Sequence, residues 1–420
     1  MNDFPKDGRT HVTVIGAGAV GITAALELIR AGCAVRVIDK LPPGEGCSFG
    51  NAGVFAAASA QPLANARTML KVPGWLIDPQ GPLHIRIRYL PRLVPWLTRF
   101  GWHGLFGDKD AATEAMHMLV ASSVDDYTRL ASEAGVSDLI RRNGWIYAYN
   151  SLAEMRSNTP TVEADGERGF AFENLSAAEL QARVPGISPH YIGGHHILGV
   201  GHTINPGRLV KALAALVERL GGEIVEAEVE AIERSDTGVS LLRTARGDFA
   251  VDKLVIAAGA YSARLSAMLG EPLPLETERG YHAMLPGRRL EAEIPVMDAG
   301  LKAVVTPMED GVRAAGTVEF ASLDAPENPQ RVHNLLNMAK RMYPDLDTSG
   351  ALTWMGRRPT LPDSLPVIDR SREAANVVYG FGHQHVGLTG APATARLIRQ
   401  LVLGEAPNID MRPYAASRFS

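Results

Sequence analysis

Apolar positions along the chain change spacing in a way that marks its first elements. An apolar run at 11–15 ends at Gly16, helical spacing of apolar residues follows over 19–30, and a second apolar run ends at Asp39. A short apolar run before a glycine turn is typical of a buried parallel strand, and the 3.6-residue spacing indicates a helix. Residues 11–39 therefore predict a β-α-β unit.

The same pattern returns in the middle and at the end of the chain. DKLVIAAGA (252–260) is a fully apolar strand that runs into a glycine, and VVYGFGHQHVGLTG (377–390) predicts a strand, a glycine-rich loop and a helix start. Between them, 275–320 alternates as an antiparallel sheet does. We expect an α/β fold (α+β overall), in which a Rossmann-like dinucleotide-binding domain is interleaved with an antiparallel-sheet substrate domain.

A chain of 420 residues is too long for one small core, which also favours two domains. The expected nucleotide-binding domain is discontinuous and comprises 8–70, 195–265 and 350–415. The substrate domain comprises 71–194 and 266–349.

Two helix starts can be predicted to the residue. Ser176 is followed three residues later by Glu179, which is the spacing of a capping box. Asn205 is a good N-cap, and Pro206 after it suits the first helical position.

Composition narrows the function classes. With 42 basic and 46 acidic residues the net charge is -4, so no basic excess points to nucleic acid. The cysteines, Cys33 and Cys47, have no zinc spacing, no metal site is expected, and their number fits a reducing compartment. The N-terminus lacks the apolar core of a signal peptide, which predicts a cytoplasmic protein.

One segment, WLIDPQGPLHIRIRYLPRLVPWLTRFGWHGLF (75–106), mixes Trp75, Trp96 and Trp102 with four arginines. Such a mixture can lie on a membrane surface. We favour a packed helical excursion of the substrate domain, and leave open a peripheral contact with the inner membrane.

The first β-α-β unit carries a GxGxxG fingerprint. Gly16 allows the tight turn, Gly18 lets a pyrophosphate approach the backbone, and Gly21 lets the helix pack closely on the strand. The helix-start N–H groups face the phosphates, and Asp39 is placed to accept hydrogen bonds from a ribose. These residues predict a bound dinucleotide.

Eight motifs then occur in order: GAGAVG, CSFGNAG, INPGRLVKAL, VIAAGAYS, RGYH, GTVEF, GRRPTLPDSLPVID and GFGHQHVGLTGAP. Together they resemble the D-amino-acid oxidase/dehydrogenase superfamily, from Val12 to about Leu403. The pattern is most similar to the bacterial D-amino-acid dehydrogenases of the small-subunit type and to D-hydroxyproline dehydrogenases. The resemblance implies FAD, a hydride taken from the carbon that bears the amine, and an imine product.

The resemblance, together with the motif chemistry, assigns cofactor contacts to four stretches. The helix start at the C-terminal loop is expected to point its N–H groups and positive dipole end at the pyrimidine side of the flavin. The expected FAD-binding residues are Gly16, Gly18, Ala19, Val20, Gly21, Asp39, Lys40, Cys47, Ser48, Asn51, Ala52, Gly53, Val229, Ala258, Gly259, Gly382, His383, Val386, Gly387, Leu388 and Thr389.

Three residues are the candidate catalytic set. Arg358, rather than Arg357, matches the GxRP arginine and would bind the substrate carboxylate through two parallel hydrogen bonds. Tyr281 could donate its hydroxyl to the same carboxylate. His385 could accept the amine proton, although His282 and His383 are alternatives. Tyr281 and His282 are neighbours in a strand, so they are not expected to face the substrate together.

The function expected is FAD-dependent dehydrogenation of a D-amino or D-imino acid, with cis-4-hydroxy-D-proline to a pyrroline carboxylate as the first choice. The alternatives are a broad D-amino-acid dehydrogenase, a sarcosine- or glycine-type oxidase that uses oxygen, an NAD-dependent dehydrogenase, and a noncatalytic flavin-bearing subunit. The electron acceptor stays open between a quinone, a flavoprotein and oxygen, and so does assembly as a homo- or hetero-oligomer.

Overall fold

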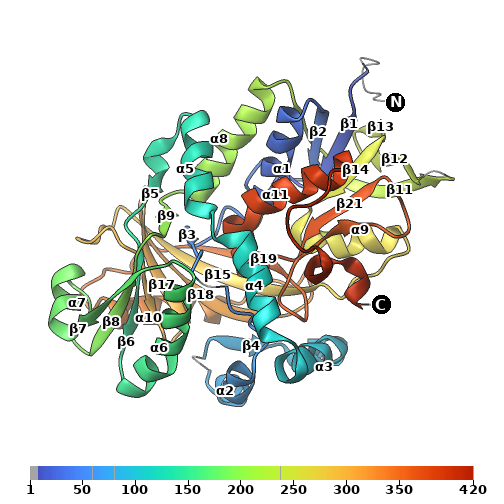
Figure 1. Ribbon diagram of the computed structural model, residues 1–420. Coiled ribbons are helices and arrows are strands. Elements are labelled where there is room, and N and C mark those ends of the chain that lie inside the picture. Colours follow the sequence, from blue (N-terminus) through green and yellow to red (C-terminus); the bar gives the residue numbers. More distant parts are fainter. Residues whose placement is uncertain (1–7, 59, 80, 237, 420) are drawn as a thin grey trace.

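The computed structural model describes residues 8–58, 60–79, 81–236 and 238–419. Two large sheets organise the molecule, and Figure 1 shows them side by side with helices on their outer faces. The six-stranded sheet has the order β10-β2-β1-β14-β21-β20, and the nine-stranded sheet has the order β19-β15-β18-β17-β16-β6-β8-β7 with β4 paired to β18.

The six-stranded sheet joins the beginning, middle and end of the chain. Its parallel strands are β1 (His11–Ile15), β2 (Ala34–Asp39), β10 (Glu223–Glu226), β14 (Lys253–Ile256) and β21 (Val377–Phe381), and β20 (Val367–Arg370) is antiparallel at one edge. Helices α1 (Ala19–Arg30), α8 (Pro206–Arg219) and α11 (Gly387–Leu403) pack beside it in one apolar core. The interleaved α/β domain predicted from the three apolar runs is confirmed.

Both predicted helix starts are also confirmed. Asn205 Oδ1 accepts a hydrogen bond from Arg208 N at 2.9 Å, and Pro206 is the first residue of α8. Ser176 and Glu179 form the reciprocal bonds of a capping box at the start of α7 (Ala177–Arg183).

The nine-stranded sheet forms the other half of the molecule. Its strands are β4 (Leu83–Ile85), β6 (Trp145–Tyr149), β7 (Phe172–Ser176), β8 (Gly193–Ile197), β15 (Glu276–Pro286), β16 (Val296–Asp298), β17 (Ala303–Met308), β18 (Gly311–Phe320) and β19 (Leu352–Thr360). β15, β17, β18 and β19 pair antiparallel, as the alternation in 275–320 predicts. Residues 195–197 of β8 and the whole of β19 lie in ranges that the sequence assigns to the nucleotide-binding domain, yet both strands belong to this sheet.

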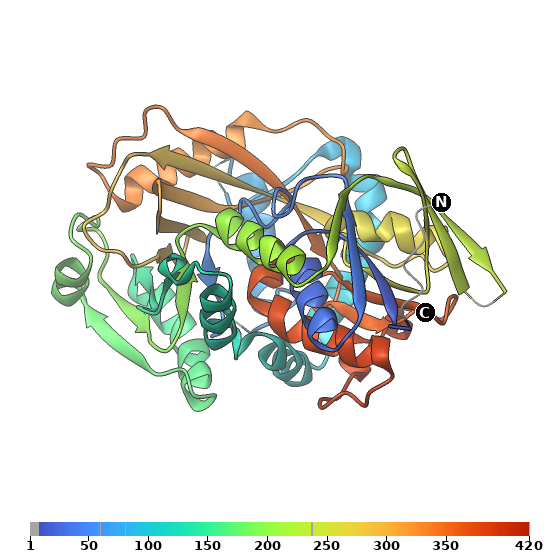
Figure 2. The ribbon, with the colours of Figure 1, turned by 90° about the horizontal axis from the view of Figure 1, so that it is seen from above.

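Smaller elements connect and cover the two sheets. They are β3 (Val54–Phe55), β5 (Ile140–Arg141), β9 (Gly201–Thr203), β11 (Val229–Ser235), β12 (Gly238–Thr244), β13 (Gly247–Ala250), α2 (Ala66–Ile77), α3 (Leu90–Phe106), α4 (Lys109–Val120), α5 (Ser123–Glu133), α6 (Leu152–Glu167), α9 (Ser262–Met268) and α10 (Pro329–Met342). Seen from above, the first and last described segments lie near each other on the side of the six-stranded sheet (Figure 2).

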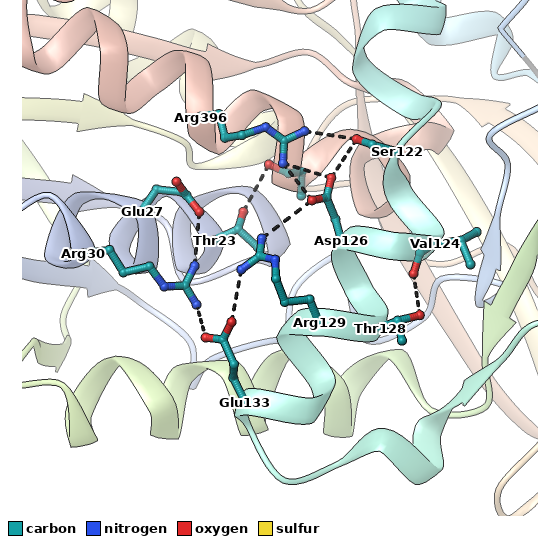
Figure 3. Close-up of polar contacts among 11 residues, drawn as sticks. Thr23, Glu27, Arg30, Ser122, Val124, Asp126, Thr128, Arg129, Glu133 and Arg396 are labelled. Atoms are coloured by element: carbon teal, nitrogen blue, oxygen red, sulfur yellow. Dashed lines mark hydrogen bonds and ion pairs between the residues drawn. The ribbon is translucent and has the colours of Figure 1, made fainter.

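Polar contacts tie α5 to two helices of the nucleotide-binding side (Figure 3). Arg396 of α11 donates from Nη1 to both carboxylate oxygens of Asp126 at 2.9 Å and from Nη2 to Ser122 Oγ at 3.0 Å. Arg30 of α1 pairs with Glu133 at the other end of α5. Because a guanidinium bound to both carboxylate oxygens is a strong, directional contact, we expect Arg396 to fix α5 against α11.

Arg396→Ala should lower the free energy of unfolding by about 1–2 kcal/mol, because it leaves the largely buried Asp126 carboxylate without its two-pronged partner. Urea unfolding measures the change. Arg129→Ala is the matched control, since Arg129 contacts the same Asp126 from a more exposed position at 3.6 Å and should cost less than about 0.5 kcal/mol. Equal losses of unfolding free energy in the two variants would contradict the role of Arg396 in fixing α5 against α11.

Candidate functional site

A cavity of about 1250 Å³ lies where the carboxyl ends of β1, β2 and β14 meet the nine-stranded sheet. Its volume exceeds the range of about 300–1,000 Å³ that is usual for small-molecule pockets. Its walls extend from Gly16 and Asp39 on the nucleotide-binding side to Gly280 and Arg358 on β15 and β19. The cavity thus has room for a long ligand and a second, smaller one.

The glycine turn forms one end of this cavity. Gly16 has a φ of +119°, and a Cβ there would collide with the carbonyl oxygen of Ala257, so only glycine fits between β1 and β14. A Cβ at Gly21 would meet the carbonyl of Gly16, which is the close helix–strand packing predicted for this glycine. Gly18 lines the cavity, and the nearest atom to a Cβ there is Ser48 Oγ at 3.4 Å.

Asp39 closes this end from β2. Its Oδ2 accepts a hydrogen bond from Ala17 N at 2.6 Å, and its Oδ1 accepts one from Leu41 N at 3.0 Å. Burial raises the pKa of the Asp39 carboxyl, and these backbone donors oppose the rise. The carboxylate therefore holds the turn itself, and each oxygen keeps a further lone pair for a ligand hydroxyl.

The neighbouring charge, Lys40, is held on the protein surface beside the cavity. Its Nζ lies 3.6 Å from the centre of the Tyr261 ring and 3.3 Å from Glu228 Oε1. These two contacts orient the ammonium group along the cavity wall.

The small-residue loop after β2 is fastened to the glycine turn. Ser48 Oγ accepts a hydrogen bond from Ala19 N at 3.0 Å, so the loop covers the start of α1. Asn51 Oδ1 accepts from Gly53 N at 2.8 Å, which closes a local turn. Burial raises the pKa of the Cys47 thiol to about 11, so Cys47 is a protonated, unreactive thiol at neutral pH.

The structure brings most of the sequence-predicted residues to one cavity. Those that line it are Gly16, Gly18, Ala19, Val20, Asp39, Lys40, Cys47, Ser48, Asn51, Ala52, Val229, Ala258, Gly259, Tyr281, Arg358, His383, His385, Gly387 and Leu388. Gly21, Gly53, Gly382, Val386 and Thr389 are outside the lining. Thr389 is instead a packing residue, whose Oγ1 accepts a hydrogen bond from Ala56 N at 3.2 Å.

The C-terminal loop brings the start of α11 to the cavity. Gly387 and Leu388 line the wall, and no side chain caps this helix start. Its positive dipole end can therefore meet a ligand that carries negative charge.

The two histidines of this loop have different surroundings. His383 is buried and its Nε2 lies 2.9 Å from Thr394 Oγ1, so its ring is fixed against α11. His385 opens into the cavity. Desolvation by the surrounding protein and, to a smaller extent, the positive charge of Arg358 lower the pKa of its imidazole to about 4. At neutral pH the His385 imidazole is uncharged and can accept a proton.

Arg358 crosses the opposite wall. Its guanidinium lies over Gly280, where any Cβ would collide with it, and Nη1 donates to Thr317 O at 3.4 Å. Among the described residues, no carboxylate lies within 4.0 Å of this guanidinium. Arg357, by contrast, donates from Nε to Leu323 O at 2.7 Å. Arg358 thus keeps Nε and Nη2 as donors for a carboxylate ligand, while Arg357, which also lines the cavity, keeps its two Nη groups.

Tyr281 lines the cavity, but its hydroxyl takes part in an interior network. It donates to Glu319 Oε2 at 2.6 Å and accepts from Asn328 N at 3.1 Å. Arg279, fully buried, pairs with the same Glu319 at 3.1 Å. In this arrangement the Tyr281 hydroxyl supports the wall and has no free donor for a ligand.

His282 points to the other face of β15, as strand alternation predicts. Its Nδ1 lies 3.1 Å from Gly50 O, and its ring stacks on Trp354 with the ring centres 5.1 Å apart. His282 does not line the cavity. The separation of Tyr281 and His282 is confirmed.

Sequence reasoning missed two residues of this wall, Glu278 and Trp354, which both line the cavity. Glu278 is directly opposite Arg358 in the β15–β19 register and is 5% exposed. Burial raises the pKa of its carboxyl to about 7, although Arg358 opposes the rise. Glu278 and Gly280 are two residues apart in one strand and therefore lie on the same face, which was the available signal for placing Glu278 there.

We expect Glu278→Gln to stabilise the FAD-free protein at pH 8 by roughly 3 kcal/mol and to have little effect near pH 4.5. A folded-state pKa of about 7 against an ordinary value of 4.5 means that the folded protein loses stability as pH rises through this window. Glutamine mimics the protonated carboxyl and removes that loss. Urea unfolding at several pH values measures it, and Glu291→Gln, at an exposed position, is the control. A pH-independent difference would contradict the assigned pKa.

Comparisons with known proteins agree with this geometry. A family model described as FAD dependent oxidoreductase matches residues 11–401. The chain is 39% identical to a D-amino-acid oxidase of Bradyrhizobium diazoefficiens, over 98% of this chain and 99% of that protein. It is 28% identical to a D-amino acid dehydrogenase of Rhodopseudomonas palustris, over 97% of each. A glycine oxidase structure from Geobacillus kaustophilus shares the fold with a TM-score of 0.75 and 22% identity, over 97% of this chain and 99% of that one.

Proposed function

Because this chain belongs to the family of FAD-dependent oxidoreductases, we propose that it oxidises a D-amino or D-imino acid at the α-carbon. The names of the two relatives support this substrate class. The observation that carries the proposal is Arg358, a guanidinium with no carboxylate within 4.0 Å among the described residues, at the far side of a cavity that begins at a dinucleotide-binding turn.

The residues present fit FAD. Gly18 lines the cavity and carries no side chain, so its backbone is open to a pyrophosphate. The lining continues past Val229 and Gly259 on one side and to Gly387 on the other, which suits a ligand as long as a dinucleotide. FAD, when bound, supplies the two-electron acceptor for a hydride.

Arg358 has the geometry to hold the substrate carboxylate. Two parallel charge-assisted hydrogen bonds would fix the carboxylate plane, and with it the direction in which the α-carbon points. Because the guanidinium is already held over Gly280, little side-chain freedom is lost on binding.

His385 and Glu278 are the groups that could receive the proton of the substrate amine. The His385 ring is neutral at pH 7, and the Glu278 carboxyl titrates near pH 7. Both groups line the same cavity as Arg358. We propose His385 as the first acceptor, since its ring opens into the cavity while Glu278 is almost fully buried.

For the substrate itself we propose cis-4-hydroxy-D-proline, oxidised to a pyrroline carboxylate. The pair RGYH and GFGHQHVG supports this choice. Other D-amino acids are the second candidate, and a sarcosine- or glycine-type oxidation is the third. The electrons would pass on to a quinone, a flavoprotein or oxygen.

The test is to mix the FAD-loaded protein with cis-4-hydroxy-D-proline without oxygen and to follow the visible absorbance of the flavin. Rapid bleaching is expected, with at least about a 100-fold slower rate for trans-4-hydroxy-L-proline, the epimer at the α-carbon. Bleaching only by other D-amino acids or by glycine would replace the substrate and keep the reaction. A flavin that no amine bleaches would favour a noncatalytic subunit.

A further inference from the structure

Residues 69–79 and 81–107, which we name the α2–α3 hairpin, lie along one side of the molecule. Figure 1 shows α2 and α3 at the lower edge, with β4 between them, outside the helices that cover the two sheets. Large apolar side chains are exposed on it, among them Leu70 at 84%, Ile87 at 86% and Trp102 at 63%. Nine of the sixteen exposed large apolar side chains in the described part of the chain belong to this hairpin.

Helix α3 is apolar on both of its faces. Leu93 and Trp96 are buried, and Trp96 packs on Phe320 of the nine-stranded sheet with ring centres 5.4 Å apart. With 3.6 residues per turn, Val94 and Leu105 fall on the side of the helix away from Trp96, and both are exposed. The inner face therefore accounts for the attachment of α3, and the outer apolar face has no partner in the described structure.

The hairpin also carries a concentrated positive charge. It contains five cations, Lys71, Arg86, Arg88, Arg92 and Arg99, and one carboxylate, Asp78, which gives +4 in a chain whose net charge is -4. Arg86 pairs with Glu319. Within the described residues, Arg88, Arg92 and Arg99 have no carboxylate within 4.0 Å. With the same spacing, Arg92 and Arg99 both fall along one edge of α3, between the exposed apolar face and Trp96.

We propose that the α2–α3 hairpin docks this protein on an anionic membrane surface. Exposed Trp, Phe and Leu side chains beside arginines match the interfacial zone of a bilayer, where apolar groups enter the acyl boundary and cations meet lipid phosphates. Trp102 and Phe106 lie together at the end of α3, with ring centres 4.7 Å apart, and form the most aromatic part of this face. Among the described residues, no helix combines the length and the apolar character that a bilayer crossing needs.

A second copy of the chain fits this face less well than lipid does. A symmetric contact through the outer face of α3 would bring the unpaired Arg92 and Arg99 of one copy close to the same charges of the other, and the hairpin offers one carboxylate to offset them. An anionic lipid surface neutralises the same charges.

The docking face adjoins the cavity. Leu76 and Leu90 are exposed on the hairpin and also line the cavity wall, as Lys71 does. Docking would bring this side of the cavity close to the lipid surface. Any benefit of this placement for catalysis rests on the proposed function, whereas the binding of the hairpin to lipid does not.

The experiment is co-sedimentation of the FAD-loaded full chain with phosphatidylcholine vesicles that either contain or lack phosphatidylglycerol. Binding is expected only to the anionic vesicles and should weaken as salt is added. Arg92→Glu with Arg99→Glu should lower the partition coefficient by at least about 100-fold. Trp102→Ser with Phe106→Ser should lower it too, while bleaching of the flavin by substrate in solution stays unchanged in both pairs.

The matched control is Arg156→Glu with Arg246→Glu, which makes the same change of charge at exposed positions on other elements. This double variant should bind the anionic vesicles with nearly the same partition coefficient as the parent chain. No binding to anionic vesicles at low salt would overturn the proposal, and so would equal losses in the control pair. Concentration-dependent dimers that Trp102→Ser with Phe106→Ser abolishes, without any vesicle binding, would assign the face to a second copy instead. Substrate-driven bleaching is measured separately, so either result leaves the proposed function to its own test.

Discussion

Arg358→Ala is expected to lower kcat/KM for the oxidised amino acid by about 100- to 1,000-fold while FAD stays bound. The guanidinium lines the cavity with no carboxylate within 4.0 Å among the described residues, and it would hold the substrate carboxylate by two charge-assisted bonds. Its loss removes the attraction for the substrate carboxylate and the orientation of the α-carbon. The rate of flavin reduction at saturating substrate should therefore fall as well.

The neighbouring arginine provides the control for this substitution. Arg357 lies next to Arg358 in β19, but its Nε is already bound to Leu323 O. Arg357→Ala should therefore retain kcat/KM within about tenfold. Arg358→Lys should recover part of the affinity but little of the orientation, because a single ammonium group cannot form the two parallel bonds. Parent-like flavin reduction in Arg358→Ala would remove this residue from the site.

Much of the nucleotide-binding half could be predicted from the sequence because its signals are local. The turn at Gly16 and the N-cap at Asn205 depend on neighbours within a few residues, as does the capping box at Ser176 in the other half of the molecule. The three apolar strands that end near glycines were also enough to predict one discontinuous sheet, since parallel strands buried on both faces show continuous apolar runs.

The opposite wall of the cavity could be predicted only in part because it depends on strand pairing. Arg358 was found through its motif, whereas Glu278 becomes its neighbour only through the register of β15 and β19. The hydroxyl of Tyr281 is bound by Glu319, which β18 supplies, and no local pattern shows this. Likewise, Trp354 lies over Gly50 through contacts between segments far apart in the sequence.

Gly16→Ala is expected to lower the affinity for FAD by at least about 100-fold and the free energy of unfolding by about 2–4 kcal/mol. Alanine is strained at a φ of +119°, and its Cβ would collide with the carbonyl of Ala257. That carbonyl cannot move freely, because Ala257 N is bonded to Ile15 O at 2.8 Å at the end of the β1–β14 pair. The substitution must therefore displace the turn that would receive the pyrophosphate.

Substitutions at two other glycines allow the loss of stability and the loss of FAD affinity to be measured separately. Gly32 also has a positive φ, +86°, but a Cβ there meets no atom within 4 Å, so Gly32→Ala should cost about 1 kcal/mol of stability and leave FAD binding intact. Gly18 has an ordinary φ of -79° and lines the cavity, so Gly18→Ala should keep the fold and weaken FAD binding. Urea unfolding of the FAD-free variants and titration with FAD measure the two effects. If Gly16→Ala behaves as Gly32→Ala does, the turn does not bind the cofactor, and the dinucleotide interpretation of this end of the cavity fails.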